Sequence, residues 1–286
     1  MKDRTNQVLQ LRDGRSLGYA EYGKPGGKPL VYFHGIPGSR KECLLAELIL
    51  RKHSIRLIVP ERPGYGCSNI LENRRIQDWP EDVVQLADHL VLDRFAVLGF
   101  SGGGSYALAC AQQLKARITA VGLLACLAPF DAPGIREAIS PDFQNMYALA
   151  AAAPEELAQD LAPVASDAQK VLLMLQETAS TPDKAIFSTP VFRNSCLDNF
   201  TESLRQGSTA VAWDLHLAAT SWGIDLAGIQ QPVRLWHGTD DRNADVVMGS
   251  YLADTVPHCR AQFMKNEGHY SLFNHMERIL QELMGL

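Results

Sequence analysis

The sequence predicts an α/β fold in which helices cover both faces of a mostly parallel sheet. Short apolar runs of strand length alternate with helical patterns up to about residue 128, and this alternation resumes near residue 232. Between them, residues 129–207 are rich in alanine, leucine, glutamate and glutamine, contain several prolines and show no convincing core strand. We therefore predict a core formed by residues 1–128 and 208–286, with a helical cap at 129–207 inserted after the sixth strand. The alternative, a set of long crossover loops, is disfavoured because structureless loops of this length are uncommon inside a domain.

Six strands are predicted before the cap and two after it. The first two, residues 8–11 and 16–20, alternate between apolar and polar side chains and flank Asp13-Gly14, which predicts an antiparallel hairpin at one edge of the sheet. The others are short apolar runs typical of parallel strands that are buried on both faces: residues 29–33, 55–59, 95–100, 118–127, 232–236 and 261–264.

Helices are predicted between these strands. Ser39-Arg40-Lys41-Glu42 fits a capping box, which predicts a helix that begins there and runs to Leu50. The segment from Asp78 to Val91 has apolar residues at helical spacing. Further helices are predicted at residues 102–115, 245–256 and 271–284.

Composition excludes several classes of function. The 286 residues carry a net charge of −5 with a pI of about 5.9, and no basic patch indicates a nucleic-acid partner. Residues 1–6 are charged rather than apolar, which predicts no signal peptide, and the longest apolar stretch, 118–130, is too short to cross a membrane. The six cysteines include no C-x-x-C pair, so we predict no metal site and free thiols in a reducing compartment, the cytoplasm.

The most informative motif is G-x-S-x-G, which reads Gly99-Phe100-Ser101-Gly102-Gly103. It lies between the predicted strand 95–100 and a helix of small residues, a setting in which the serine occupies a sharp turn with its hydroxyl exposed. Glycines let the two backbones approach closely, and backbone N–H groups at a helix N-terminus favour developing negative charge. The motif and its setting indicate a nucleophilic serine, although a glycine-serine turn without chemistry gives the same pattern.

Polar residues follow four of the predicted strands at their carboxyl ends, where open parallel sheets bind their ligands. His34-Gly35-Ile36-Pro37-Gly38 follows the third strand, Ser101 the fifth, His237-Gly238-Thr239-Asp240-Asp241 the seventh and Glu267-Gly268-His269 the eighth. A serine needs a base to become a nucleophile, and a histidine held by a carboxylate supplies one. Ser101, Asp241 and His269 occur in the order nucleophile, acid, histidine, with Asp240 as the alternative acid.

These motifs, together with Arg62-Pro63-Gly64-Tyr65-Gly66-Cys67-Ser68, resemble those of the α/β-hydrolase family over nearly the whole chain. The resemblance implies an eight-stranded, mostly parallel sheet flanked by helices, and it is strongest to the capped branch that includes carboxylesterases. It selects Asp241, three residues after Gly238, as the acid that holds His269. It also places the oxyanion hole at the backbone N–H groups of Ile36 and Gly102, supported by loop residues His34, Gly35, Gly99 and Gly103, with His34 ordering the loop through hydrogen bonds.

The resemblance implies a serine hydrolase that cleaves a small-molecule carboxylic ester through an acyl-enzyme intermediate, with no cofactor and no metal. Two features depart from the family: Ala244-Asp245 follows the acid where Val-Pro is common, and Gly102-Gly103-Gly104 lacks the tryptophan common in proline iminopeptidases. A serine in place of an aspartate nucleophile disfavours a haloalkane dehalogenase or an epoxide hydrolase. Alternatives that use the same triad are an aminopeptidase, a C–C bond hydrolase and a cofactor-free perhydrolase. An alternative of another class is a ligand-binding receptor with an idle hydrolase site.

Overall fold

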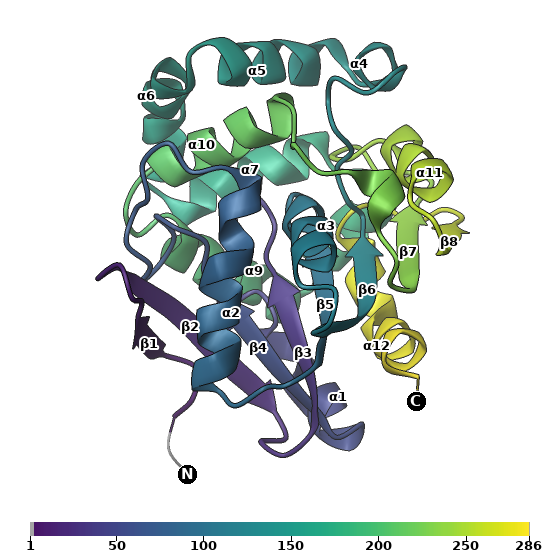
Figure 1. The fold of residues 1–286 in the computed structure, drawn as a ribbon. Coiled ribbons are helices and arrows are strands. Elements are labelled where there is room, and N and C mark those ends of the chain that lie inside the picture. The colour runs from purple at the N-terminus through teal and green to yellow at the C-terminus, as the bar shows by residue number, and fades with distance from the viewer. Residues whose placement is uncertain (1–2, 286) are drawn as a thin grey trace.

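A computed structural model describes residues 3–285 and shows one eight-stranded sheet in the order β1-β2-β4-β3-β5-β6-β7-β8 (Figure 1). β1 (Gln7–Gln10) pairs with β2 (Ser16–Gly23), and this predicted hairpin forms one edge of the sheet. β2 also runs antiparallel to β4, whereas every later pair is parallel. The predicted fold class is therefore confirmed. The remaining strands are β3 (Lys28–Phe33), β4 (Ile55–Pro60), β5 (Phe95–Phe100), β6 (Ile118–Leu124), β7 (Val233–Gly238) and β8 (Cys259–Met264).

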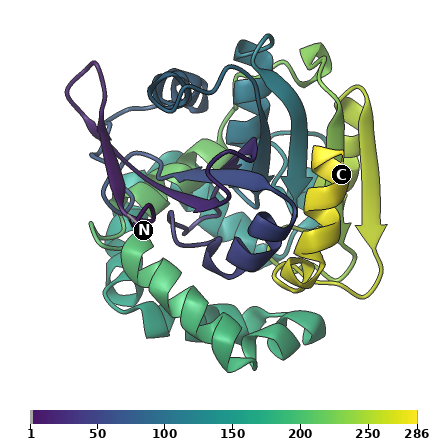
Figure 2. The ribbon, with the colours of Figure 1, turned by 90° about the horizontal axis from the view of Figure 1, so that it is seen from below.

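The central strands are buried because helices cover both faces of the sheet. Every residue of β5 is buried, and its alternate side chains enter two different hydrophobic clusters, Val97 on one face and Leu98 on the other. The helices α2 (Trp79–His89), α3 (Gly103–Gln113) and α11 (Val246–Thr255) pack on the Val97 face. α1 (Glu47–Lys52) and α12 (Met276–Met284) pack on the Leu98 face, opposite α2 and α3 (Figure 2).

The predicted helix from residue 39 to Leu50 is wrong at its start. A 3-10 turn, η1 (Leu44–Ala46), leads into α1, and no helix begins at Ser39. The side chains that would have formed the capping box are used elsewhere: the hydroxyl of Ser39 donates to Asn199 at 2.8 Å, and Glu42 accepts hydrogen bonds from Tyr32 and Gly35. In a capping box Glu42 would accept the Ser39 N–H, but that N–H donates to Asn199 at 2.9 Å, so these tertiary contacts override the local signal.

Seven helices lie between β6 and β7 in the described chain, and Figure 1 shows those of residues 135–165 beyond the carboxyl end of β6. Several prolines of this segment lie in the first turn of a helix. Because an N–H group there has no partner within the helix, proline is tolerated, and these residues begin helices rather than break them. We call these seven the cap helices: α4 (Ile135–Ala138), α5 (Pro141–Ala152), α6 (Pro154–Ala165), α7 (Ala168–Thr178), α8 (Thr181–Phe187), α9 (Pro190–Ser203) and α10 (Thr209–Ala219).

The edges of several elements differ from the prediction. The helical layer continues past residue 207 into α10, which packs against α5 and α6. β6 ends at Leu124 rather than at residue 127, and the final helix begins as a 3-10 turn, η4 (Ser271–His275), before α12. None of the helices within residues 3–285 is both long enough and apolar enough to cross a membrane.

Candidate active site

Ser101 lies on the sharp turn between β5 and α3. Its φ of 53° falls in the left-handed region, an uncommon backbone conformation for a residue other than glycine. The turn is closed by the Ser101 N–H, which donates to the carbonyl of Leu124 at 2.9 Å. The flanking glycines are sterically required: a Cβ at Gly99 would lie 2.5 Å from the carbonyl oxygen of Gly103, and one at Gly103 would lie 2.1 Å from that of Phe33. This geometry is the strained strand-to-helix turn that exposes a nucleophile.

His269 and Asp241 come from the loops after β8 and β7 and form a buried pair. The distance from His269 Nδ1 to Asp241 Oδ2 is 2.7 Å. The other carboxylate oxygen of Asp241 accepts the backbone N–H groups of Asn243 and Ala244, each at 2.8 Å, which fixes the orientation of the carboxylate. Burial on its own lowers the pKa of His269, but the adjacent Asp241 carboxylate raises it by more, so the net pKa lies above 6.5.

Asp240 does not take part in this pair. Its side chain is exposed and accepts a hydrogen bond from the hydroxyl of Thr239 at 2.9 Å. The structure thus brings Asp241, rather than the alternative Asp240, to His269. His237 is buried nearby, and its Nε2 donates to the carbonyl of Ala244 at 2.8 Å, which supports the same loop.

The turn that carries Ser101 adjoins the histidine loop. Phe100, the residue before Ser101, has its ring centroid 4.8 Å from that of His269. Among the described residues, however, no hydrogen bond joins the Ser101 hydroxyl to His269. Such a bond is often long or misaligned in an unliganded site and tightens when the substrate is bound.

The loop after β3 lies against the turn that carries Ser101. A Cβ at Gly102 would lie against the Cδ1 of Ile36, so the Ile36 side chain can pack over this turn because Gly102 has no side chain. Within residues 3–285, no acceptor is hydrogen-bonded to the backbone N–H of Ile36 or of Gly102. Two free N–H groups beside a nucleophile can both donate to an oxyanion.

His34 and Arg62 hold this loop in place. The Arg62 N–H donates to His34 Nε2 at 3.2 Å, so the ring proton is on Nδ1, which donates to the carbonyl of Gly35 at 2.9 Å. The Arg62 guanidinium donates to the carbonyls of His34 and Gly35 at 2.6 and 2.8 Å. Burial lowers the pKa of His34, and the positive charge of Arg62 lowers it further, so this histidine is neutral. Its geometry is that of a loop-ordering residue.

A buried ionic cluster links this loop to the cap, and it gave no signal in the sequence. Asp214 on α10 accepts from the guanidinium of Arg62 at 2.8 Å and from that of Arg74. The hydroxyls of Tyr65 and Tyr106 donate to the same carboxylate at 2.9 and 2.7 Å. Burial alone raises the pKa of Asp214, but the two arginines reverse the effect and hold it well below its usual range. The cluster fastens the cap to the loops after β3 and β4.

We expect Asp214→Ala to lower the free energy of unfolding by about 3–5 kcal/mol, because it leaves two buried guanidinium groups without a counter-charge. Urea denaturation of the wild type and the variant measures this loss. Asp160→Ala is the matched control, since Asp160 is exposed on α6 and its removal is expected to change stability by no more than about 0.5 kcal/mol. An unchanged unfolding midpoint for Asp214→Ala would contradict the assigned role.

Glu42 is hydrogen-bonded to the loop after β3 and supports its conformation. Its Oε2 accepts from the Tyr32 hydroxyl at 2.8 Å and from the Gly35 N–H at 3.0 Å, and its Oε1 accepts from the Asn199 amide at 3.4 Å. Burial raises the pKa of Glu42 to about 7, against the opposing effect of the hydrogen bonds from Tyr32 and Gly35. Asn199 lies on α9, so this contact is a second link between the candidate oxyanion loop and the cap.

A cavity of about 420 Å³ lies between this region of the core and the cap. Its walls come from η1, α1, α8, α9 and η4 and are mostly apolar, with Ile49, Phe192 and Phe273 among them. Phe100 and Tyr270, the chain neighbours of Ser101 and His269, form part of the wall. An apolar group therefore has space beside these two neighbours, whereas Ser101 and His269 themselves are not among the residues that line the cavity.

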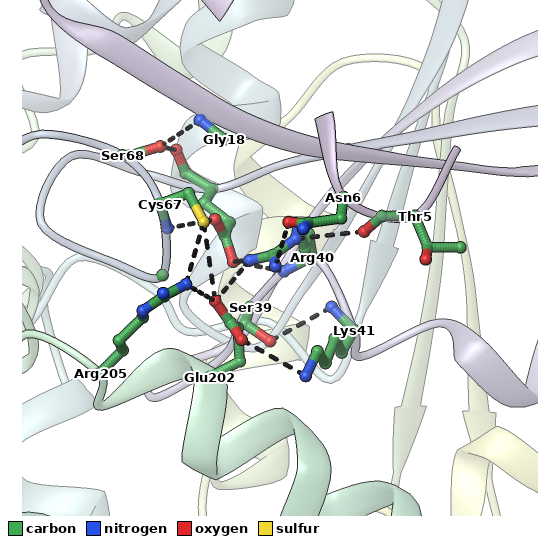
Figure 3. A network of polar contacts seen from close by, with 12 residues as sticks. Thr5, Asn6, Gly18, Ser39, Arg40, Lys41, Cys67, Ser68, Glu202 and Arg205 are labelled. Carbon is green, nitrogen blue, oxygen red and sulfur yellow. Dashed lines mark hydrogen bonds and ion pairs between the residues drawn. The ribbon is translucent and has the colours of Figure 1, made fainter. Parts of the chain in front are cut away.

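Glu61, Cys67 and Glu202 place ligand atoms within 4.8 Å of one another, close enough to hold a metal ion. Figure 3 shows Cys67 and Glu202 of this group beside Arg40. Arg40 already occupies the space between the two carboxylates, because its Nη1 lies 2.7 Å from Glu61 and 2.7 Å from Glu202. Lys41 adds a second positive charge 3.3 Å from Glu202. The donor set is therefore neutralised by the chain itself, and it acts as a third link between the core and the cap helices.

The eight-stranded sheet, the serine turn and the buried histidine–aspartate pair together have the arrangement of the alpha/beta hydrolase fold. A family model described as the alpha/beta hydrolase fold matches residues 28–276, and the chain belongs to this family. A hydrolase from Pseudomonas aeruginosa PA01 has a TM-score of 0.75 at 19% identity, with 98% of each chain covered. The enol-lactonase from Burkholderia xenovorans LB400 has a TM-score of 0.72 at 19% identity, over 98% of this chain and 100% of that one. At this identity the likeness shows the fold.

The chain is also similar in amino-acid sequence to a protein that is named as a peptidase. A proline iminopeptidase from Arabidopsis thaliana is 29% identical over 123 residues, which are 40% of this chain and 31% of the relative. The chain thus matches less than half of the length of that relative.

Proposed function

We propose that the protein is a serine hydrolase that cleaves carboxylic esters through an acyl-enzyme intermediate. The observation that carries this proposal is the buried pair of His269 and Asp241, 2.7 Å apart, beside the strained turn of Ser101. A histidine held in this way can act as a general base towards a serine hydroxyl. The resemblance in fold to an enol-lactonase adds support, because a lactone is a cyclic ester.

In the proposed mechanism, the Ser101 hydroxyl attacks the ester carbonyl while His269 Nε2 takes up its proton. The Asp241 carboxylate stabilises the imidazolium that forms. The N–H groups of Ile36 and Gly102 donate to the oxyanion of the tetrahedral intermediate, where a single donor contributes roughly 10²–10³-fold in rate. His269 then protonates the leaving alcohol, and a water activated by the same histidine hydrolyses the acyl-enzyme.

The carboxylates of α6 give no support to an aminoacyl peptide as the substrate. A peptidase of this type needs a carboxylate that binds the amine of its substrate. Glu155, Glu156 and Asp160, the carboxylates of α6, are all exposed on the surface of the helix. The cavity beside Phe100 and Tyr270 is mostly apolar, which supports an ester whose acyl or alcohol group is small to medium-sized and apolar.

Steady-state hydrolysis of p-nitrophenyl esters of increasing acyl length, measured beside an aminoacyl anilide and its desamino ester, tests the proposal. We expect many turnovers per protein molecule with the esters and slow or no release of aniline. Preference for the aminoacyl anilide would overturn the ester proposal in favour of an aminopeptidase. Stoichiometric binding of the esters without turnover would instead indicate a receptor with an idle site.

A further inference from the structure

Asp183 is a buried carboxylate of the cap that contacts the histidine loop directly. It lies in the first turn of α8 and is 1% exposed. Its Oδ2 accepts the backbone N–H of His269 at 2.9 Å, and its Oδ1 accepts those of Tyr270 and Ser271, each at 2.8 Å. The Ser180 hydroxyl donates a fourth hydrogen bond, at 2.9 Å. One side chain of the cap therefore satisfies three consecutive N–H groups of the core.

These three bonds fix the backbone from which the His269 side chain projects. Tyr270 is the N-cap residue of η4 and Ser271 is its first residue, so their N–H groups have no partner within the turn. The Asp183 carboxylate, which comes from α8, accepts both of them. The contact is also tight, because a Cβ at Gly268 would lie 2.3 Å from Ser180 Oγ and 2.4 Å from Asp183 Oδ2. The histidine loop and the start of α8 are therefore packed together with no intervening space.

We propose that Asp183 is a positioning residue that holds His269 in the orientation required for proton transfer, so that a competent site forms only when the cap is seated on the core. This inference rests on the proposed function, in which His269 is the general base. Asp241 fixes the imidazole ring through Nδ1, whereas Asp183 fixes the backbone on which the ring is carried. Displacement of a catalytic group by about 1 Å can lower the rate by about 100-fold.

The charge of Asp183 gives this role a signature that simple support of the fold would not have. Burial lowers the pKa of His269, and Asp241 and, to a smaller extent, Asp183 raise it. Glu42 adds a further negative charge in the same direction, from the loop after β3. Removal of the Asp183 charge is therefore expected to lower the pKa of His269 and to move the acid limb of kcat/KM to lower pH.

Asp183→Asn is the most direct test. The two N–H donors at Oδ1 hold the amide oxygen at that position, so the NH₂ group faces the N–H of His269, which loses its acceptor. We expect kcat to fall roughly 10- to 100-fold with little change in KM. The acid limb of the variant should lie at lower pH than that of the wild type, because the pKa of His269 is no longer raised by the Asp183 charge. NMR titration of the His269 ring should show the same shift independently of turnover.

Three further variants complete the design. Ser180→Ala removes one donor but leaves the three backbone bonds, and Lys184→Gln alters an exposed residue of the same helix, so both should keep kcat within about twofold of the wild type. Gly268→Ala forces α8 away from the histidine loop and should repeat the loss in kcat. If Asp183→Asn does not fold, the kcat of Gly268→Ala tests whether the contact between α8 and the histidine loop is needed for turnover.

A wild-type kcat and acid limb in Asp183→Asn would overturn the proposal, as would a loss of kcat with an unchanged His269 titration. An inactive wild type that shows no reaction with a serine-directed probe would contradict the proposed function itself. A wild type that reacts with the probe, together with the same kcat in Asp183→Asn and in the control variants, would contradict only the role of Asp183.

Discussion

Replacing Ser101 with alanine is expected to abolish ester turnover without disturbing the fold. The hydroxyl is the only group lost, and the turn that carries it is held by backbone contacts, including the bond from the Ser101 N–H to Leu124. Loss of the nucleophile from a serine–histidine–aspartate site lowers kcat by about 10⁴- to 10⁶-fold. The kcat of the purified variant on the best ester of the series measures the effect.

Circular dichroism and urea denaturation show whether the Ser101→Ala variant keeps its fold. Ser250→Ala on α11 is the matched control, since it removes a hydroxyl of the same kind that donates only to the carbonyl of Val246 in its own helix, and its kcat should equal that of the wild type. Undiminished hydrolysis by Ser101→Ala would refute the assignment of the nucleophile.

Asp241→Asn is expected to cause the second large loss, about 10⁴-fold in kcat. The N–H groups of Asn243 and Ala244 both donate to Oδ1, so they hold the amide oxygen of the new side chain at that position. The NH₂ group then faces His269 Nδ1, which has to accept rather than donate. The ring proton moves to Nε2, and the nitrogen that faces the nucleophile can no longer act as a base.

Asp240→Asn separates this effect from a general loss of charge in the loop. Asp240 neighbours Asp241 in sequence but is exposed, so its amide should leave kcat within about twofold of the wild type. Equal losses in the two variants, or a larger loss in Asp240→Asn, would show that the acid has been assigned to the wrong aspartate. The comparison therefore tests the register of the loop after β7.

The fold and the main elements of the site follow from local features of the sequence. Two alternating stretches predicted the hairpin and apolar runs predicted the other six strands, and the G-x-S-x-G motif between a strand and a helix placed Ser101 on a turn between β5 and α3. His269 could be assigned to the same edge of the sheet because the carboxyl ends of parallel strands converge. These predictions depend on contacts within a segment or on the general geometry of parallel sheets.

Other features depend on contacts between distant segments, and a single sequence carries no signal for them. Ser39 and Glu42 match a capping box, yet Ser39 bonds to Asn199, 160 residues away, and the predicted helix start fails. Asp214 is 152 residues from Arg62, and Asp183 is 86 residues from His269. The only local signal is that Asp183 lies three residues after Ser180 at a helix start, a pattern that indicates a cap and not a contact with the histidine loop.

The central claim is that Ser101 is a nucleophile activated by His269. Incubation of the full-length protein with a fluorophosphonate probe, followed by peptide mass spectrometry, tests it directly, because such probes react with activated serines. We expect a single adduct on Ser101 in the wild type and none in a folded His269→Ala variant. A folded wild type that stays unlabelled, or an adduct on another residue, would contradict it.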